Sequence, residues 1–137
     1  MLTEERPWNL LTDITSDEFI LRMLELGRPI ETTLVGVFDK EGRGSRQDIE
    51  LPLHKDGEYS ARKAAEEGRT FTKQVDYVGL YCLRGGNTIT LLEHNNQLYE
   101  IALEPGEALV FDNRVCRHGR RGQVGDRVLL RLWITAE

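Results

Sequence analysis

The second half of the chain alternates between short apolar segments and turn residues, and this pattern constrains the fold most strongly. Segments rich in apolar and β-branched side chains lie at residues 75–84, 88–92, 98–103, 108–111 and 127–136. The polar run HNNQ at 94–97 and the pair Pro105 and Gly106 separate some of them and are typical of tight turns. Many short strands joined by turns predict a β-sandwich or barrel.

The first half adds helices to this pattern. Thr15 and Glu18 have the spacing of a capping box, Phe19 and Met23 recur at helical spacing, and Gly27 is a suitable stop. Further along we expect a strand at 32–38, a surface loop at 39–48, an extended stretch at 49–59 and a short helix at 60–68. The expected fold class is α+β, mainly β, with an N-terminal helix packed on the strands.

Size and charge narrow the class of protein. A chain of 137 residues fits one domain, so we expect a single domain over 1–137. A net charge of −5 disfavours nucleic acid as a partner. The N-terminus has no signal-peptide pattern, and no apolar run has the length of a membrane span. Cys82 and Cys116 form no CxxC pair, so we expect two buried, reduced thiols in a cytoplasmic protein.

The three histidines carry the strongest chemical signal. His54 and Asp56 stand two apart in the extended stretch, where alternate side chains point to the same face. His118 follows 64 residues later, after the segment that ends at Phe111. Two imidazoles and one carboxylate on one octahedral face leave three positions open, as in non-haem Fe(II) oxygenases. We therefore take His54, Asp56 and His118 as candidate metal ligands and catalytic residues.

Three further motifs lie between the HKD triplet at 54–56 and the end of the sequence. Residues 108–118 read ALVFDNRVCRH, residues 80–88 read LYCLRGGNT, and residues 126–133 read DRVLLRLW. Together with the HKD triplet at 54–56, these motifs resemble the taurine dioxygenase/clavaminate synthase-like family of Fe(II)/2-oxoglutarate-dependent dioxygenases. The resemblance covers roughly residues 50–137 and implies a double-stranded β-helix, the jelly-roll fold shared with cupins.

The resemblance also implies cofactors and their ligands. Fe(II) and 2-oxoglutarate would be bound, and O2 would convert 2-oxoglutarate to succinate and CO2 while a small organic substrate is hydroxylated. Arginines suit the distal carboxylate of 2-oxoglutarate because a guanidinium matches a carboxylate with two hydrogen bonds. The RxxxR spacing favours Arg127, whereas the distance from His118 favours Arg131, to which we give a slight preference. Thr88, in the GG-x-T motif, would donate to the same carboxylate.

Asp56 favours a hydroxylase over a halogenase, because halogenases of this class lack the metal-binding carboxylate. Family members are about twice as long, so the sequence does not show what covers the substrate, or whether a homo-oligomer completes the pocket. Arg84, Arg117, Arg120 and Arg131 favour an anionic substrate. Three alternatives stay open: a cupin-type metal protein, a non-catalytic jelly roll that binds an organic acid, and a zinc hydrolase.

Overall fold

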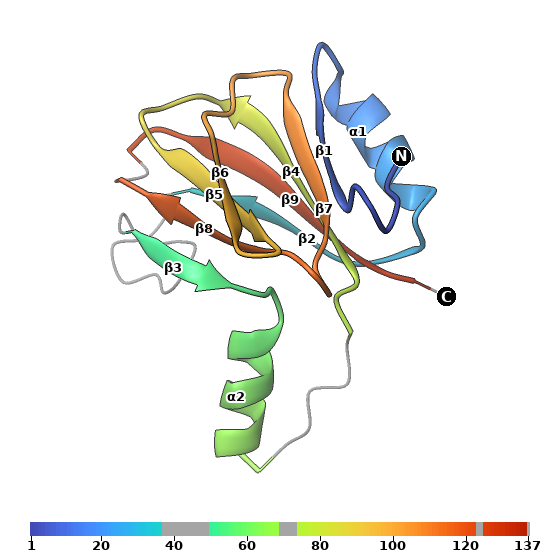
Figure 1. Cartoon of the computed structure of the whole chain (residues 1–137), viewed down its shortest axis with the longest axis vertical. Coiled ribbons are helices and arrows are strands. Elements are labelled where there is room, and N and C mark those ends of the chain that lie inside the picture. Colours follow the sequence, from blue (N-terminus) through green and yellow to red (C-terminus); the bar gives the residue numbers. More distant parts are fainter. Residues whose placement is uncertain (37–49, 69–73, 123–124, 137) are drawn as a thin grey trace.

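A computed structural model describes residues 1–36, 50–68, 74–122 and 125–136 as two antiparallel sheets with two helices (Figure 1). The five-stranded sheet has the order β1 (Trp8–Leu11), β7 (Ala108–Asp112), β4 (Tyr77–Arg84), β9 (Val128–Thr135), β2 (Arg28–Val35). The four-stranded sheet has the order β3 (Leu51–His54), β8 (Arg117–Arg121), β5 (Ile89–His94), β6 (Gln97–Ile101). The helices are α1 (Ser16–Leu24) and α2 (Glu58–Glu66). The mainly β, α+β class predicted from the sequence is confirmed.

Two hydrophobic cores hold these layers together. One core joins the facing sides of the two sheets and includes Leu92 from β5, Phe111 from β7 and Leu129 from β9. The other lies on the opposite face of the five-stranded sheet, where Phe19 and Met23 of α1 are fully buried. Successive residues of β9 therefore belong to different cores, as the alternation of its sequence predicts.

Helix α1 begins where the sequence predicts. The Thr15 hydroxyl accepts a hydrogen bond from the Glu18 backbone N–H, and the Glu18 carboxylate accepts one from the Thr15 backbone N–H, which completes the capping box. Gly79 on β4 lies under the helix, and a Cβ there would stand 2.7 Å from atoms of Phe19 and Met23. The glycine thus allows α1 to pack closely against the sheet.

Two strands were not predicted from the sequence. Strand β1 has only four residues and pairs with β7 at one edge of the five-stranded sheet. Strand β8 has the sequence RHGRR, which lacks apolar alternation, yet it pairs with β3 on one side and β5 on the other. A strand that lies between two others is stabilised by hydrogen bonds to both neighbours. Its own residue pattern therefore says little about whether it forms a strand.

The segment around the HKD triplet also differs from the prediction. Strand β3 ends at His54, a turn follows with Gly57 at φ 93°, and α2 begins at Glu58. The extended stretch expected up to residue 59 therefore ends five residues early. Strand β2 begins four residues before the predicted strand and ends at Val35, and the loop expected at 39–48 lies outside the described residues.

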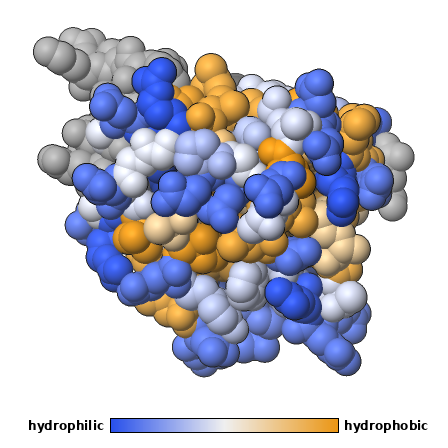
Figure 2. Space-filling model, turned by 90° about the horizontal axis from the view of Figure 1, so that it is seen from above, coloured by the Kyte–Doolittle hydropathy of each residue, from blue (hydrophilic) through white to orange (hydrophobic). Residues whose placement is uncertain are grey.

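The surface carries both polar and apolar side chains. In the view from above, polar side chains border a central band of apolar surface (Figure 2). The large apolar side chains that are exposed come from several elements, among them Leu21 of α1, Leu34 of β2, Leu83 of β4 and Leu98 of β6. Neither described helix has the length and apolar character needed to cross a membrane.

Candidate metal centre

The pairing of β3 with β8 brings the two histidines together. His54 and His118 are register partners in this antiparallel pair, and their ring centroids are 4.4 Å apart. Gly119 allows the strands to meet here, because a Cβ at this position would lie 2.6 Å from the carbonyl oxygen of Leu51. The glycine beside His118 therefore has a structural role that the motif alone does not reveal.

Asp56 reaches the same place from the turn after β3. The expectation that His54 and Asp56 converge by strand alternation is wrong, since only His54 is on a strand. Asn113 holds the turn instead. Its Oδ1 accepts a hydrogen bond from the Asp56 backbone N–H at 3.0 Å, and its Nδ2 donates to the carbonyl oxygens of Asp56 at 3.0 Å and Val75 at 2.9 Å. The asparagine of the DNR triplet thus ties the Asp56 turn to the loop that leads to His118.

One carboxylate oxygen faces both imidazoles. Asp56 Oδ1 lies 3.4 Å from His54 Nε2 and 3.3 Å from His118 Nε2. His54 Nδ1 is 2.8 Å from the carbonyl oxygen of Pro52, which can only accept, so Nδ1 carries the proton and Nε2 keeps its lone pair for a ligand. His118 Nδ1 is buried and has no hydrogen-bond partner among the described residues.

The electrostatics keep the carboxylate charged. Burial raises the pKa of Asp56, but the charge of His118 and the hydrogen bonds that both imidazoles donate when they are protonated outweigh it, and the pKa lies well below its ordinary value. Burial lowers the pKa of His54, whereas its hydrogen bonds to Asp56 and to the Pro52 carbonyl raise it, and the net shift is upward. A cation placed among the three groups would replace the protons that these shifts favour.

The three side chains fit a divalent metal ion. Their ligating atoms, Nε2 of His54, Nε2 of His118 and Oδ1 of Asp56, all lie within 4.8 Å of one another. Atoms bound about 2.1 Å from a common metal lie roughly 3.0–3.4 Å apart across a right or tetrahedral angle. The observed N–O separations of 3.3 and 3.4 Å agree with that spacing.

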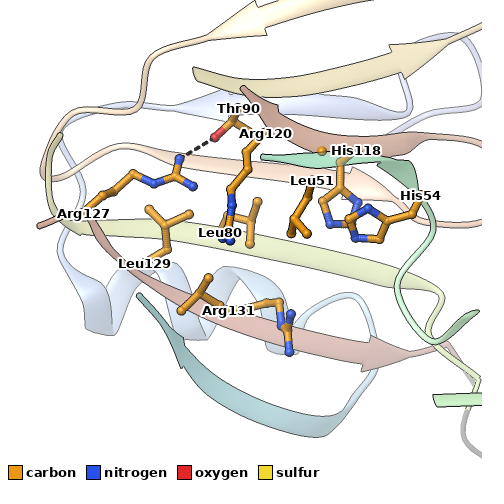
Figure 3. Close-up of a pocket in the computed structure, with 11 residues that line it drawn as sticks. Leu51, His54, Leu80, Thr90, His118, Arg120, Arg127, Leu129 and Arg131 are labelled. Carbon is orange, nitrogen blue, oxygen red and sulfur yellow. Dashed lines mark hydrogen bonds between the residues drawn. The ribbon is translucent and has the colours of Figure 1, made fainter. Parts of the chain in front are cut away.

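A pocket extends from the histidines along the space between the sheets (Figure 3). Its lining includes three arginines, Arg120, Arg127 and Arg131, and no described lining residue is acidic. Leu51, Leu80 and Leu129 form its apolar walls. The histidines occupy one end, and Arg127 occupies the other (Figure 3). The pocket therefore has a cluster that could hold a cation at one end and a buried arginine at the other.

Arg127 is the most deeply buried of the three arginines that line the pocket. Its side chain is 3% exposed, and its Nη1 donates to Thr90 Oγ1 at 2.9 Å. Its Nε has no partner among the described residues, and burial lowers the pKa of its guanidinium. Arg131 is half-buried, and its guanidinium lies 4.6 Å from the ring centroid of Trp133. A buried guanidinium with an unused N–H favours an anionic ligand.

The other predicted residues lie outside the lining of the pocket. Thr88 is buried just before β5 and is not among the residues that line the pocket; Thr90, two positions on, is the threonine that contacts Arg127. Arg84 and Arg117 are exposed and do not line the pocket. Both cysteines are buried and free, as predicted.

Three residues at the site were not predicted to act there. Asn113 and Trp133 appeared only as members of motifs, and Thr90 was in no motif. The indole N–H of Trp133 donates to Asp56 Oδ2 at 2.8 Å. Thr90 follows the predicted Thr88 by two residues, so strand alternation was the signal that could have found it.

The chain matches no protein-family model, and no curated protein matches it either.

Proposed function

We propose that this chain is a small Fe(II)/2-oxoglutarate-dependent oxygenase that hydroxylates a small anionic substrate. The observation that carries the proposal is the cluster of His54, Asp56 and His118 at one end of an arginine-lined pocket. Two imidazoles and one carboxylate are the ligands that non-haem Fe(II) oxygenases use, and the arginines supply the charge that a dicarboxylate requires.

The order of the strands supports a double-stranded β-helix as the scaffold. From β2 onward the chain passes from one sheet to the other at every connection except the β5–β6 hairpin. A jelly roll winds its strands between two sheets in this way. In this chain the two histidines lie on β3 and β8 of one sheet, and Arg131, which lines the same pocket, lies on β9 of the other.

Each residue of the metal end has a separate task. His54 and His118 present Nε2 toward the metal position, and the Pro52 carbonyl holds His54 in the required tautomer. Asp56 supplies the negative charge that favours a divalent cation. With Fe(II) bound, the centre would activate O2 and couple the decarboxylation of 2-oxoglutarate to oxidation of the substrate.

The arginines would hold the distal carboxylate of 2-oxoglutarate. The position of Arg131 in the chain favours that residue, but the enclosure of Arg127, its bond to Thr90 and its unused Nε favour Arg127. We assign the distal carboxylate to Arg127 with Thr90. Arg131, closer to Asp56 and half-buried, would then contact the anionic group of the substrate. The leucines between the two ends would exclude water from the reacting atoms.

The decisive experiment is an anaerobic titration with Fe(II) followed by 2-oxoglutarate. We expect a visible charge-transfer band from the chelate, which His54→Ala abolishes. The matched control is His94→Ala, which removes the one histidine of the sequence that is outside the cluster. A wild-type chain that binds Fe(II) without forming the band is a cupin-type metal protein, and one that binds 2-oxoglutarate without metal is a carboxylate-binding module. Either result refutes the proposal.

The same charge-transfer band can be used to measure 2-oxoglutarate affinity, and it shows which of the two arginines binds the distal carboxylate. Loss of a charge-assisted hydrogen bond costs about 1.5–3 kcal/mol of binding free energy, so Arg127→Met should weaken 2-oxoglutarate binding roughly 10- to 100-fold. Arg131→Met should weaken it much less. The reverse order would transfer the distal carboxylate to Arg131 and leave Arg127 for the substrate.

A further inference from the structure

The two oxygens of Asp56 have different surroundings. Oδ1 faces Nε2 of His54 and Nε2 of His118 at 3.4 and 3.3 Å, whereas Oδ2 accepts the indole N–H of Trp133 at 2.8 Å. The carboxyl group is almost completely enclosed, so bulk water does not compete for Oδ2. One oxygen is thus directed to the metal position, and the other is held by a neutral donor.

Trp133 is held rigidly enough to define that geometry. It lies on β9, the strand that pairs with both β4 and β2, and its register partners are Val78 and Glu31. Its side chain is 6% exposed, and the guanidinium of Arg131 covers its ring at 4.6 Å. An indole N–H donates only and does not titrate, so the bond to Oδ2 persists over the whole working pH range.

The number of open metal positions depends on this bond. A carboxylate can bind a metal through one oxygen or through both, and the second mode occupies an additional position. Two imidazoles and one carboxylate oxygen leave three positions on an octahedral metal. A 2-oxo acid chelate takes two of them and O2 takes the third, so a carboxylate that binds through both oxygens would leave one too few.

We propose that Trp133 is a positioning residue that keeps Asp56 a one-oxygen ligand and so preserves three open positions at the metal. This inference rests on the proposed function and assigns to that site a residue that is neither one of the three candidate metal ligands nor one of the residues that line the pocket. Partners of metal ligands commonly alter affinity or activity 10- to 100-fold when removed.

Trp133→Phe tests the inference, because it removes the N–H and retains an aromatic ring. The matched control is Trp8→Phe, which removes the only other tryptophan, on β1. Mn(II) is the probe, and two quantities are measured: the number of water molecules on protein-bound Mn(II), from water-proton relaxation, and the affinity of the Mn(II)-loaded protein for 2-oxoglutarate. Neither readout depends on turnover, and a loss of packing alone would leave the water count unchanged.

We expect Trp133→Phe to lose one Mn(II)-bound water and to bind 2-oxoglutarate on the order of 10-fold more weakly. Mn(II) affinity should stay within about threefold, and the control should match wild type. If the folded variant keeps the wild-type water count or the wild-type 2-oxoglutarate affinity, the inference is overturned while the proposed function stands. If wild type binds no Mn(II), the proposed function fails, and the inference fails with it.

A second substitution covers the case in which Trp133→Phe does not fold. Benzothienylalanine has nearly the shape of tryptophan but carries sulfur in place of the N–H. Incorporated for tryptophan in the Trp8→Phe background, it changes Trp133 alone. The same two readouts and the same expected results then apply.

Discussion

Asn113 connects the two segments that carry the proposed metal ligands Asp56 and His118, so Asn113→Ala should affect stability and metal binding together. The side chain is 4% exposed and takes part in three hydrogen bonds, two with the backbone of Asp56 and one with the Val75 carbonyl. Alanine removes all three and leaves one backbone N–H and two carbonyls without their partner.

The expected loss follows from those three bonds. Each contributes about 1 kcal/mol net to the free energy of unfolding, and a buried group left unpaired costs about 1–3 kcal/mol. We therefore expect Asn113→Ala to lower the free energy of unfolding by about 3 kcal/mol in total. With a urea m-value of about 2 kcal/mol/M for a chain of this size, the midpoint of unfolding should fall by about 1.5 M.

The assay is urea unfolding followed by circular dichroism, with a chelator present so that metal binding does not contribute to stability. The matched control is Asn87→Ala, an exposed asparagine, which should change the free energy of unfolding by less than about 0.5 kcal/mol. Mn(II) affinity, measured separately, should fall for Asn113→Ala alone. A midpoint equal to that of the control would show that the Asp56 turn is held by other contacts, and the reasoning would be refuted.

Two further predictions concern packing. Burial raises the pKa of the Cys82 thiol, and it raises that of Cys116 to about 12, with the nearby charges of Asp112 and Glu93 adding to it. Because a higher pKa leaves less thiolate, neither thiol should react with a disulfide reagent at about pH 8 until denaturant is added, and rapid reaction of the native chain would contradict the structure. Gly79→Ala should lower the free energy of unfolding by about 1–3 kcal/mol, because the new Cβ would collide with α1. Gly85→Ala is its control, since the nearest atom to a Cβ there is 3.4 Å away, and equal unfolding midpoints for the two variants would count against the close approach of the helix.

Local features were predictable from the sequence because their causes lie within a few residues. The capping box of Thr15 and Glu18 forms as expected. The HNNQ run forms a two-residue hairpin turn between β5 and β6, with Asn95 and Asn96 at positive φ and His94 paired with Gln97. Asparagine tolerates this conformation better than most residues, so the turn is encoded in the residues themselves.

Features that depend on distant partners were predicted less well. RHGRR has no strand pattern, and it becomes β8 because β3 and β5 supply its hydrogen bonds from both sides. Asp56 was expected on a strand and lies in a turn that Asn113 holds from 57 residues away. The threonine that meets Arg127 is Thr90, because the register of β5 against β8 directs that side chain into the pocket.

For the candidate metal site, the sequence by itself determined which side chains could bind a cation, because their identities follow from their chemistry and their order in the chain. Only the tertiary structure decided how they meet. The register of β3 against β8 pairs His54 with His118, and the turn brings Asp56 Oδ1 to both imidazoles. The tertiary structure also brings Trp133, 77 residues away along the chain, to the other carboxylate oxygen of Asp56. The physical reason is that a hydrogen bond to one particular oxygen depends on positions in space, which distance along a chain does not specify.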